Sequence, residues 1–419
     1  MKRLYFVSLI IFLVSGCSQN TSTFDLPENQ GVSSERLDRI DSYLNKAIKD
    51  NQIPGAVALI RRNNKIIYNK AFGYSDVENK IMYSTDDIFR IASMTKAVTS
   101  LAVLMLWEEG KFNLDDHIEK YIPEFKNLKI LTNFNDTDST YLSKPAENKI
   151  SIRHLLTHTS GIGYGVVDLD TRFKAIYKKK GIVDLFTTDS IDIESNVKKL
   201  AQLPLHHEPG EAVTYGESLD VLGYFIEVIS QKSLDVFFKE RIFDPLEMQD
   251  TYFYLPKTHQ DRLVPIQTKK DGFWTKYQGD FYDTNYPIKG AKTFLSGGAG
   301  LSSTTEDYSN FLQMFLNKGS FNDKQILGKK TVELVYVNQN SHIPSSPFGL
   351  AFGLVSEKDQ ALGGKGSIGT LYWSGYFHTY FFVDPVEELI GIIYLQTYDY
   401  TSYLIPNEFK SLVFHSLIN

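Results

Sequence analysis

The sequence has a single cysteine, Cys17, in 419 residues. Because a disulfide needs two cysteines, this chain can form no internal disulfide and must hold its fold by packing alone. It also lacks an excess of basic residues, with 44 Lys and Arg against 50 Asp and Glu and a net charge of -6. This balance offers no basic surface to nucleic acid, so we expect no nucleic-acid partner.

The sequence also lacks the usual patterns that bind metals and phosphates. His154 and His158 are four residues apart, but no Glu follows the first in a His-Glu-x-x-His arrangement, and no second cysteine is available. Structural hydrogen bonding is the favoured interpretation of both histidines. The glycine-rich residues 296–303 lack the Gly-x-x-x-x-Gly-Lys-Ser/Thr arrangement of a phosphate loop. We therefore expect neither a metal nor a cofactor.

The N-terminus has the features of an export signal. Lys2 and Arg3 precede an apolar run at residues 4–14, and Ser15-Gly16-Cys17 follows it. This order of basic, apolar and small residues predicts a signal peptide over residues 1–17. The run is too short for a membrane span, which needs about 20 apolar residues. Residues 18–32 are polar and unpatterned, which predicts a tether.

The segment Val14-Ser15-Gly16-Cys17 resembles the bacterial lipobox. The resemblance implies that Cys17 becomes the lipidated first residue of the mature protein. The protein would then be exported and lipid-anchored to the bacterial cell envelope, in the periplasm or at the outer membrane, with the membrane as its partner through Cys17. The alternative is an ordinary signal peptide that contains a cysteine.

Strand-like runs occur near both ends of the chain and flank a mostly helical middle. Apolar runs at residues 56–60 and 66–68, separated by polar turn residues, predict a hairpin. More strand-like runs follow at residues 348–355, 369–373, 379–383 and 389–395. We predict an α/β fold of the α+β type, with an antiparallel sheet built from both chain ends, flanked by helices, and an inserted mostly helical domain.

The predicted folded domain spans residues 33–418. Within it, we assign the sheet subdomain to residues 33–90 and 295–418. The helical subdomain takes residues 91–294.

The segment Ser93-Met94-Thr95-Lys96 places a hydroxyl and an amine three residues apart at the start of an expected long helix. Side chains at positions i and i+3 share a helix face, so both can point into one cleft. An alcohol becomes a good nucleophile beside a base, and a lysine serves as that base once burial favours its neutral amine. The first helical turn also favours developing negative charge. Ser-x-x-Lys alone is short and common, so its neighbours must support the assignment.

The ordered motifs of this chain resemble those of the serine hydrolase family of class C β-lactamases, penicillin-binding DD-peptidases and related esterases. Ser93 and Lys96 fit the first family motif, and Tyr215, on a loop before a helical pattern, matches the tyrosine of the second. Trp373-Ser374-Gly375 falls where the third motif belongs. Two family landmarks, residues 154–161 and 297–301, fit as well. The resemblance covers nearly the whole mature chain and implies a β-lactamase/DD-peptidase-like fold.

Two departures from the family pattern bear on the substrate. The second motif usually reads Tyr-x-Asn, but Glu217 holds its third place, and Trp373 stands where the third motif usually has Lys or His. In lactam-recognising members, the resemblance implies, that Asn binds the substrate amide and that Lys binds its carboxylate. An indole removes charge attraction for an anion, and a carboxylate at Glu217 would repel one. The Trp-x-Gly form resembles the esterase branch, whose substrates need not carry a carboxylate.

The resemblance also implies roles for the site residues. Ser93 attacks the carbonyl of a small-molecule ester or amide, while Lys96 and Tyr215 relay the proton as general base and acid. The sequence leaves open which of the two is the base. The implied oxyanion hole consists of the backbone N–H groups of Ser93 and Tyr376. The residues assigned to substrate binding are Trp373, Ser374, Gly375 and Glu217.

Two alternatives to an esterase remain at this point. The first is an amidase acting on D-amino acid or cell-wall peptides, or a β-lactamase, and the missing Lys or His at Trp373 argues against both. The second is a non-catalytic, lipid-anchored binding protein that keeps the fold, because a fold alone does not secure a function. Intact Ser93, Lys96 and Tyr215 are hard to reconcile with that second alternative.

Overall fold

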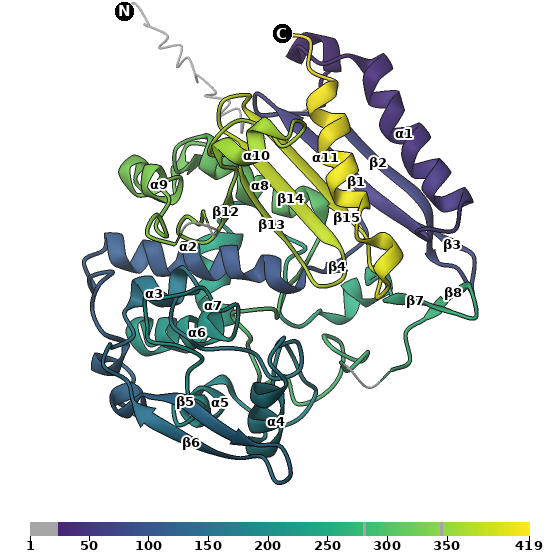
Figure 1. Cartoon of the computed structure of the whole chain (residues 1–419). Helices are drawn as coiled ribbons and strands as arrows, with labels where there is room; N and C mark the ends of the chain where they lie inside the picture. The colour runs from purple at the N-terminus through teal and green to yellow at the C-terminus, as the bar shows by residue number, and fades with distance from the viewer. Residues whose placement is uncertain (1–23, 280–281, 344–346) are drawn as a thin grey trace, which may run out of the picture.

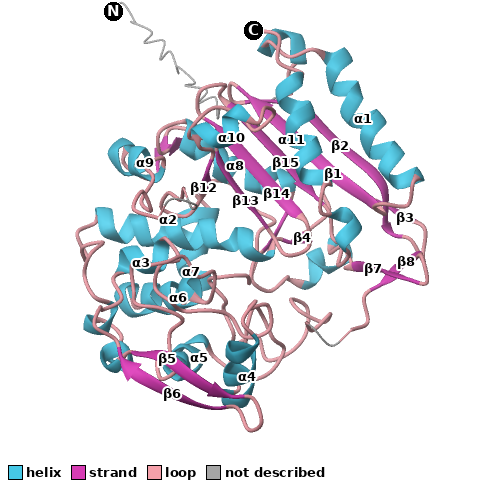
Figure 2. Cartoon of the chain, in the orientation of Figure 1, coloured by secondary structure: helices cyan, strands magenta, loops and turns pink. Residues whose placement is uncertain are grey.

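The computed structural model describes residues 24–279, 282–343 and 347–419. Within these residues, the largest sheet has seven antiparallel strands in the order β12-β13-β14-β15-β1-β2-β3. Its strands are β1 (Gly55–Arg62), β2 (Lys65–Asp76), β3 (Ile81–Met82), β12 (Gly353–Leu354), β13 (Leu371–Ser374), β14 (Thr379–Asp384) and β15 (Leu389–Tyr394). The strands come from both ends of the chain, which confirms the predicted antiparallel sheet (Figure 2).

Helices cover both faces of this sheet (Figure 1). The helices α1 (Ser34–Lys49) and α11 (Ile405–His415) pack on one face, and α8 (Thr305–Leu316) packs on the other. Residues of β1 therefore alternate between two apolar cores, with Ala58 and Ile60 facing α1 and α11, and Leu59 facing α8. Because both faces are covered, every residue of β1, β14 and β15 is buried.

The predicted hairpin is formed by β1 and β2. Its turn residues Asn63 and Asn64 have φ angles of 50° and 64°. Two-residue hairpin turns of this kind need positive φ at both positions, and asparagine tolerates that conformation better than most residues. Strand β15 pairs with the other edge of β1, with Val57 opposite Tyr394. The first and last parts of the chain are thus joined in the middle of the sheet.

The inserted part of the chain is mostly helical and lies beside one end of the sheet (Figure 1). Its helices are α2 (Thr95–Glu108), α3 (Ile152–Leu156), α4 (Thr171–Lys180), α5 (Ile193–Leu200), α6 (Ser218–Ser230) and α7 (Leu234–Phe238). Helix α6 contacts α2, α3, α5 and α7. The hairpin of β5 (Lys129–Asn135) and β6 (Thr140–Pro145) accompanies them. A second hairpin, β7 (Gln267–Lys270) with β8 (Phe273–Lys276), lies beside β2, where the Gln267 side chain donates to the carbonyls of Tyr74 and Ser75.

The remaining strands and α-helices of the described residues are short. They are β4 (Phe89–Arg90), β9 (Ser302–Ser303), β10 (Ser320–Phe321), β11 (Lys324–Gln325), α9 (Lys329–Val335) and α10 (Glu357–Ala361). None of the helices in the described ranges is long and apolar enough to cross a membrane.

The described part of the predicted tether, residues 24–32, packs on the domain. Asp25 donates its backbone N–H to the carbonyl of Ile66 over 3.0 Å, and Val32 is buried. A short 3-10 helix, η1 (Pro27–Gln30), connects them. Edge backbone groups of β2 and the apolar Val32 supply the contacts that a purely polar pattern did not indicate. The predicted signal peptide and Cys17 lie outside the described residues.

Candidate active site

Ser93 lies at the junction between the sheet and the helical part. It belongs to the 3-10 helix η2 (Ala92–Met94), which runs directly into α2. Ala92, just before it, has φ of 43°. A non-glycine residue in this left-handed region costs about 1–3 kcal/mol, and such strain is typical of functional sites. Because α2 is buried over most of its length, it provides a rigid support for the hydroxyl.

Lys96 joins the predicted nucleophile to two other groups. Its Nζ donates to the Ser93 Oγ over 3.3 Å, to the Tyr164 hydroxyl over 2.8 Å and to the Gly298 carbonyl over 2.7 Å. Three acceptors match the three hydrogens of an ammonium group. The side chain is 1% exposed, so these contacts replace water around the cation. The predicted pairing of Ser93 with Lys96 is therefore present in the structure.

Tyr215 lies beside this pair but contacts the lysine through its ring. The Lys96 Nζ is 4.8 Å from the centroid of the Tyr215 ring, a cation–π distance. Within the described part of the chain, the Tyr215 hydroxyl has no hydrogen bond to Ser93 or Lys96. The phenol that accepts from Lys96 is Tyr164, a residue that the sequence analysis missed. Tyr164 stands in a loop three residues after Gly161, where no periodic pattern or motif singles it out.

The third motif places the end of β13 against the nucleophile segment. A Cβ added to Gly375 would lie 2.3 Å from the carbonyl oxygen of Ile91. Only glycine therefore allows this close approach of the two backbones. The next residue, Tyr376, therefore follows the end of β13 that meets the Ser93 segment. The assignment of the Ser93 and Tyr376 backbone N–H groups to an oxyanion hole stays a prediction.

Aromatic side chains form one wall of the site. His158 has its ring centroid 4.8 Å from that of Tyr215, 5.5 Å from that of Phe348 and 6.2 Å from that of Trp373. Burial, together with the nearby charge of Lys96, lowers the pKa of His158 to about 3. The imidazole is thus neutral at ordinary pH. The wall built from His158, Tyr215, Phe348 and Trp373 carries no charge, which suits an uncharged group of a substrate.

A cleft of about 920 Å³ opens at Ser93. Its lining includes six of the residues that the sequence analysis assigned to the site: Ser93, Tyr215, Trp373, Ser374, Gly375 and Tyr376. Lys96 lies beneath it, hydrogen-bonded to Ser93. The tertiary structure therefore gathers residues from the first, second and third motifs around a single cavity.

Glu217 does not lie on this cleft, which corrects its predicted role in substrate binding. Its side chain is fully buried, at 0% exposure, and sits next to Asp184 and Asp220. Burial and these two carboxyl neighbours raise the pKa of Glu217 well above its ordinary value. A carboxyl group that is enclosed by protein and absent from the cleft lining does not meet the substrate as the sequence analysis expected. Glu217 is the residue directly before α6, and its side chain makes no capping hydrogen bond to that helix.

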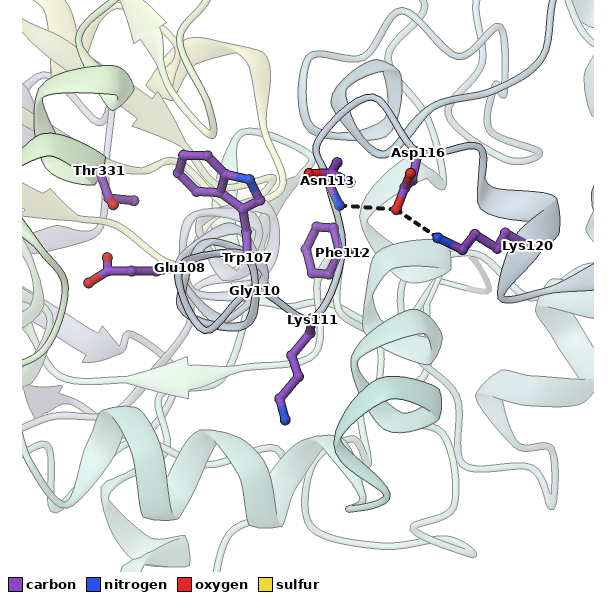
Figure 3. A pocket seen from close by; sticks show the side chains of 9 residues that line it. All are labelled: Trp107, Glu108, Gly110, Lys111, Phe112, Asn113, Asp116, Lys120 and Thr331. Carbon is purple, nitrogen blue, oxygen red and sulfur yellow. Dashed lines mark hydrogen bonds and ion pairs between the residues drawn. The ribbon is translucent and has the colours of Figure 1, made fainter.

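Another hollow lies at the opposite end of α2 (Figure 3). It is lined by Trp107, Gly110, Phe112 and six polar residues: Glu108, Lys111, Asn113, Asp116, Lys120 and Thr331. Asp116 accepts a hydrogen bond from the backbone N–H of Asn113 and another from Lys120. Ser93 and Lys96 are not among its lining residues. The cleft at Ser93 is therefore the candidate active site.

Comparisons with known proteins identify the family of the chain. A family model described as Beta-lactamase matches residues 40–408 of the chain. Protein Rv1367c of Mycobacterium tuberculosis is 32% identical over 381 residues, which cover 86% of this chain and 90% of that protein. Esterase EstB of Burkholderia gladioli is 28% identical over 372 residues, which cover 86% of this chain and 90% of the esterase.

A solved structure has the same fold. EstCE1, "a hydrolase with promiscuous acyltransferase activity", matches with a TM-score of 0.77 at 24% sequence identity. The match covers 90% of this chain and 98% of that one. At this identity the likeness concerns the fold, and it extends over both the sheet and the helical part.

Proposed function

The chain belongs to the Beta-lactamase family and is a serine hydrolase, and on that premise we propose that it cleaves carboxylic esters through an acyl-enzyme on Ser93. The observation that carries the proposal is the hydrogen bond from Lys96 to Ser93 at the floor of the cleft. The relatives lend support, since one similar protein is named an esterase and another a hydrolase with acyltransferase activity.

The proposed chemistry has two stages. In the first, the Ser93 Oγ bonds to the ester carbonyl carbon while its proton passes to Lys96, to which it is hydrogen-bonded. The ester C–O bond then breaks, and the departing alcohol takes a proton from the Lys96–Tyr215 pair. For this step the lysine amine must be neutral before it accepts the proton. In the second, water attacks the acyl group, the carboxylic acid leaves, and Ser93 regains its proton. In both stages the backbone N–H groups of Ser93 and Tyr376 would stabilise the oxyanion.

The neutral aromatic wall supports esters without a charged group next to the carbonyl. A carboxylate placed against His158, Phe348 and Trp373 would lose water and gain no cation from these three side chains. At this wall, this disfavours the lactam-type substrates that the family resemblance associates with a Lys or His at position 373. The lysines in the cleft lining, Lys365 and Lys410, are not part of the wall. The proposal is tested against two alternative functions. One is an amidase acting on D-amino acid or cell-wall peptides, and the other is a non-catalytic binding protein.

The test compares hydrolysis of p-nitrophenyl butyrate by the purified wild-type protein and two serine variants. Ser93→Ala should abolish turnover. Ser100→Ala, on the same buried helix but without a hydrogen-bond partner among the described residues, should retain it. Equal activity in wild type and Ser93→Ala would show that Ser93 is not the nucleophile. An inactive wild type whose Ser93 reacts with a fluorophosphonate probe would favour an amidase, and one that does not react would favour a binding protein.

We also propose that the protein is exported and lipid-anchored through Cys17, as the lipobox-like sequence indicates. Membrane fractionation of tagged protein tests the anchor, because Cys17→Ala should release the protein into the soluble fraction. Equal distribution of the two proteins would refute it.

A further inference from the structure

Three carboxyl groups meet behind Lys96. Glu217 and Asp220 are 0% and 1% exposed, and the Oδ1 atom of Asp184 is buried. The Glu217 side chain is within hydrogen-bonding contact of both aspartates. This cluster, Asp184, Glu217 and Asp220, includes the residue that replaces the usual Asn of the second motif. The proposed chemistry uses none of the three.

The hydrogen bonds around the cluster determine how many protons it holds. No N–H or hydroxyl group of the described residues donates to either Glu217 oxygen, to Asp184 Oδ1 or to Asp220 Oδ2. Two ionised carboxylates in contact repel each other, and both can only accept. The contact of Glu217 with Asp184 and that of Glu217 with Asp220 therefore each require a proton on one of the two carboxyl groups. Burial likewise raises the pKa of Glu217 and that of Asp184.

Asp220 is the member best placed to carry the remaining negative charge. Its Oδ1 accepts from the Ser296 hydroxyl over 2.6 Å and from the Gly298 backbone N–H over 3.2 Å. A proton on Glu217 then satisfies Asp220 Oδ2, and a proton on Asp184 satisfies the second Glu217 oxygen. Asp184 accepts in turn from the backbone N–H of Val166, two residues beyond Tyr164.

The hydrogen bonds of Asp220 lead directly to the catalytic lysine. The Gly298 N–H points to Asp220 while the Gly298 carbonyl accepts from Lys96 over 2.7 Å. The Ser296 hydroxyl, held by Asp220, also accepts from the backbone N–H of Ala299 over 2.9 Å. A Cβ on Gly298 would lie 2.2 Å from Asp220 Oδ2, so the carboxyl group packs tightly beneath this turn. Asp220 thus holds the turn that presents an acceptor to Lys96.

We propose that Asp220 is a positioning residue for Lys96, and that Glu217 is a neutral, protonated acid that keeps a single negative charge on Asp220. This inference rests on the proposed function, because it concerns the proton acceptor of the ester cleavage. It explains how a glutamate can occupy the second motif without placing a charge in the cleft.

The other titratable groups around the cluster are mostly phenols. Tyr164 and Tyr177 face it, and burial together with the carboxyl groups raises the pKa of each well above its ordinary value. Asp168 lies near Tyr177, and Tyr215 near Tyr164. Lys96 is the cation that approaches Asp220, through Gly298. A change in the charge of Asp220 should therefore alter the balance between the ammonium and amine forms of Lys96.

Three variants test the proposal through the dependence of kcat/KM on pH. Glu217→Gln should lower kcat by less than about threefold and keep the wild-type profile, because an amide resembles a protonated acid in shape. Asp220→Asn should move the acid limb about one pH unit lower, since losing a nearby negative charge favours the neutral amine. Asp220→Ala, which removes the acceptor for Gly298, should lower kcat by about tenfold or more.

A matched control is Asp307→Asn, a buried carboxyl that bonds to Thr251 outside the cleft and should leave the acid limb in place. The proposal is overturned if Glu217→Gln shifts the acid limb of the kcat/KM–pH profile. It is also overturned if the profiles of Asp220→Asn and wild type coincide. Infrared spectra give a readout that needs no turnover, because Glu217→Gln should remove a protonated-carboxyl C=O band at pH 7. If this band disappears in a protein without esterase activity, the proposed function fails but the protonated Glu217 stands. If the band is absent from wild type, the proton assignment fails.

Discussion

Lys96 donates a 2.8 Å hydrogen bond to the hydroxyl of Tyr164, which lies 68 positions later in the chain. This contact is shorter than the 3.3 Å bond from the same Nζ to Ser93. Tyr215, the tyrosine of the second motif, presents its ring to the lysine. Two phenols therefore surround the Lys96 amine, and they contact it in different ways.

Replacing Tyr164 with phenylalanine tests the first of these contacts. Tyr164→Phe removes one acceptor from the buried ammonium group that forms when Lys96 takes the Ser93 proton, and a hydrogen bond to a charged group contributes about 1.5–3 kcal/mol. We expect kcat for p-nitrophenyl butyrate to fall by about tenfold or more in steady-state assays. Tyr121→Phe, whose hydroxyl donates to Asp116 away from the cleft, is the control and should stay near wild type. Equal rates for Tyr164→Phe and wild type would show that this hydrogen bond does not assist the reaction.

Trp373 should determine how the enzyme treats anionic acyl groups. The matched substrates are p-nitrophenyl valerate and the mono-p-nitrophenyl ester of glutarate, which differ in a terminal methyl or carboxylate. We expect wild type to prefer the neutral ester by at least about tenfold in kcat/KM, because the aromatic wall offers the carboxylate no charge partner. Trp373→Lys should lower the ratio of kcat/KM for the neutral ester to kcat/KM for the anionic ester, whereas Trp373→Phe should preserve this ratio. The interpretation fails if wild type prefers the anionic ester, or if the lysine variant leaves the ratio unchanged.

His158 should make folding stability depend on pH. Its pKa is about 3 in the folded protein against an ordinary value of 6.5, so only the unfolded chain binds this proton between those values. The free energy of unfolding therefore decreases as pH falls below about 6.5, by at most about 1.4 kcal/mol per pH unit from this residue. Urea denaturation between pH 8 and pH 4.5 measures the free energy of unfolding of wild type and of His158→Phe. The quantity to follow is the difference between the two proteins at each pH. That difference should shrink toward low pH, and a constant difference would contradict the assignment.

Much of the fold could be predicted because its signals are local. The alternation of apolar runs and turn residues indicated the β1–β2 hairpin, and the strand-like runs near both ends indicated the antiparallel sheet. The polar composition of residues 18–32 did not indicate that residues 24–32 pack on the domain. Their contacts come from backbone groups of Ile66 and Ile418, which a composition argument cannot detect.

The sequence by itself determined the pairing of Ser93 with Lys96, because residues three apart share one face of a helix wherever that helix lies. It also placed Trp373 in the third motif, in order along the chain. Only the tertiary structure decided that Tyr164 accepts from Lys96 and that Glu217 is buried with Asp184 and Asp220. Those contacts join loops far apart in the sequence, and their geometry depends on how the helical part packs against the sheet. Side-chain direction on a loop follows from such packing, and no periodicity in the sequence reports it.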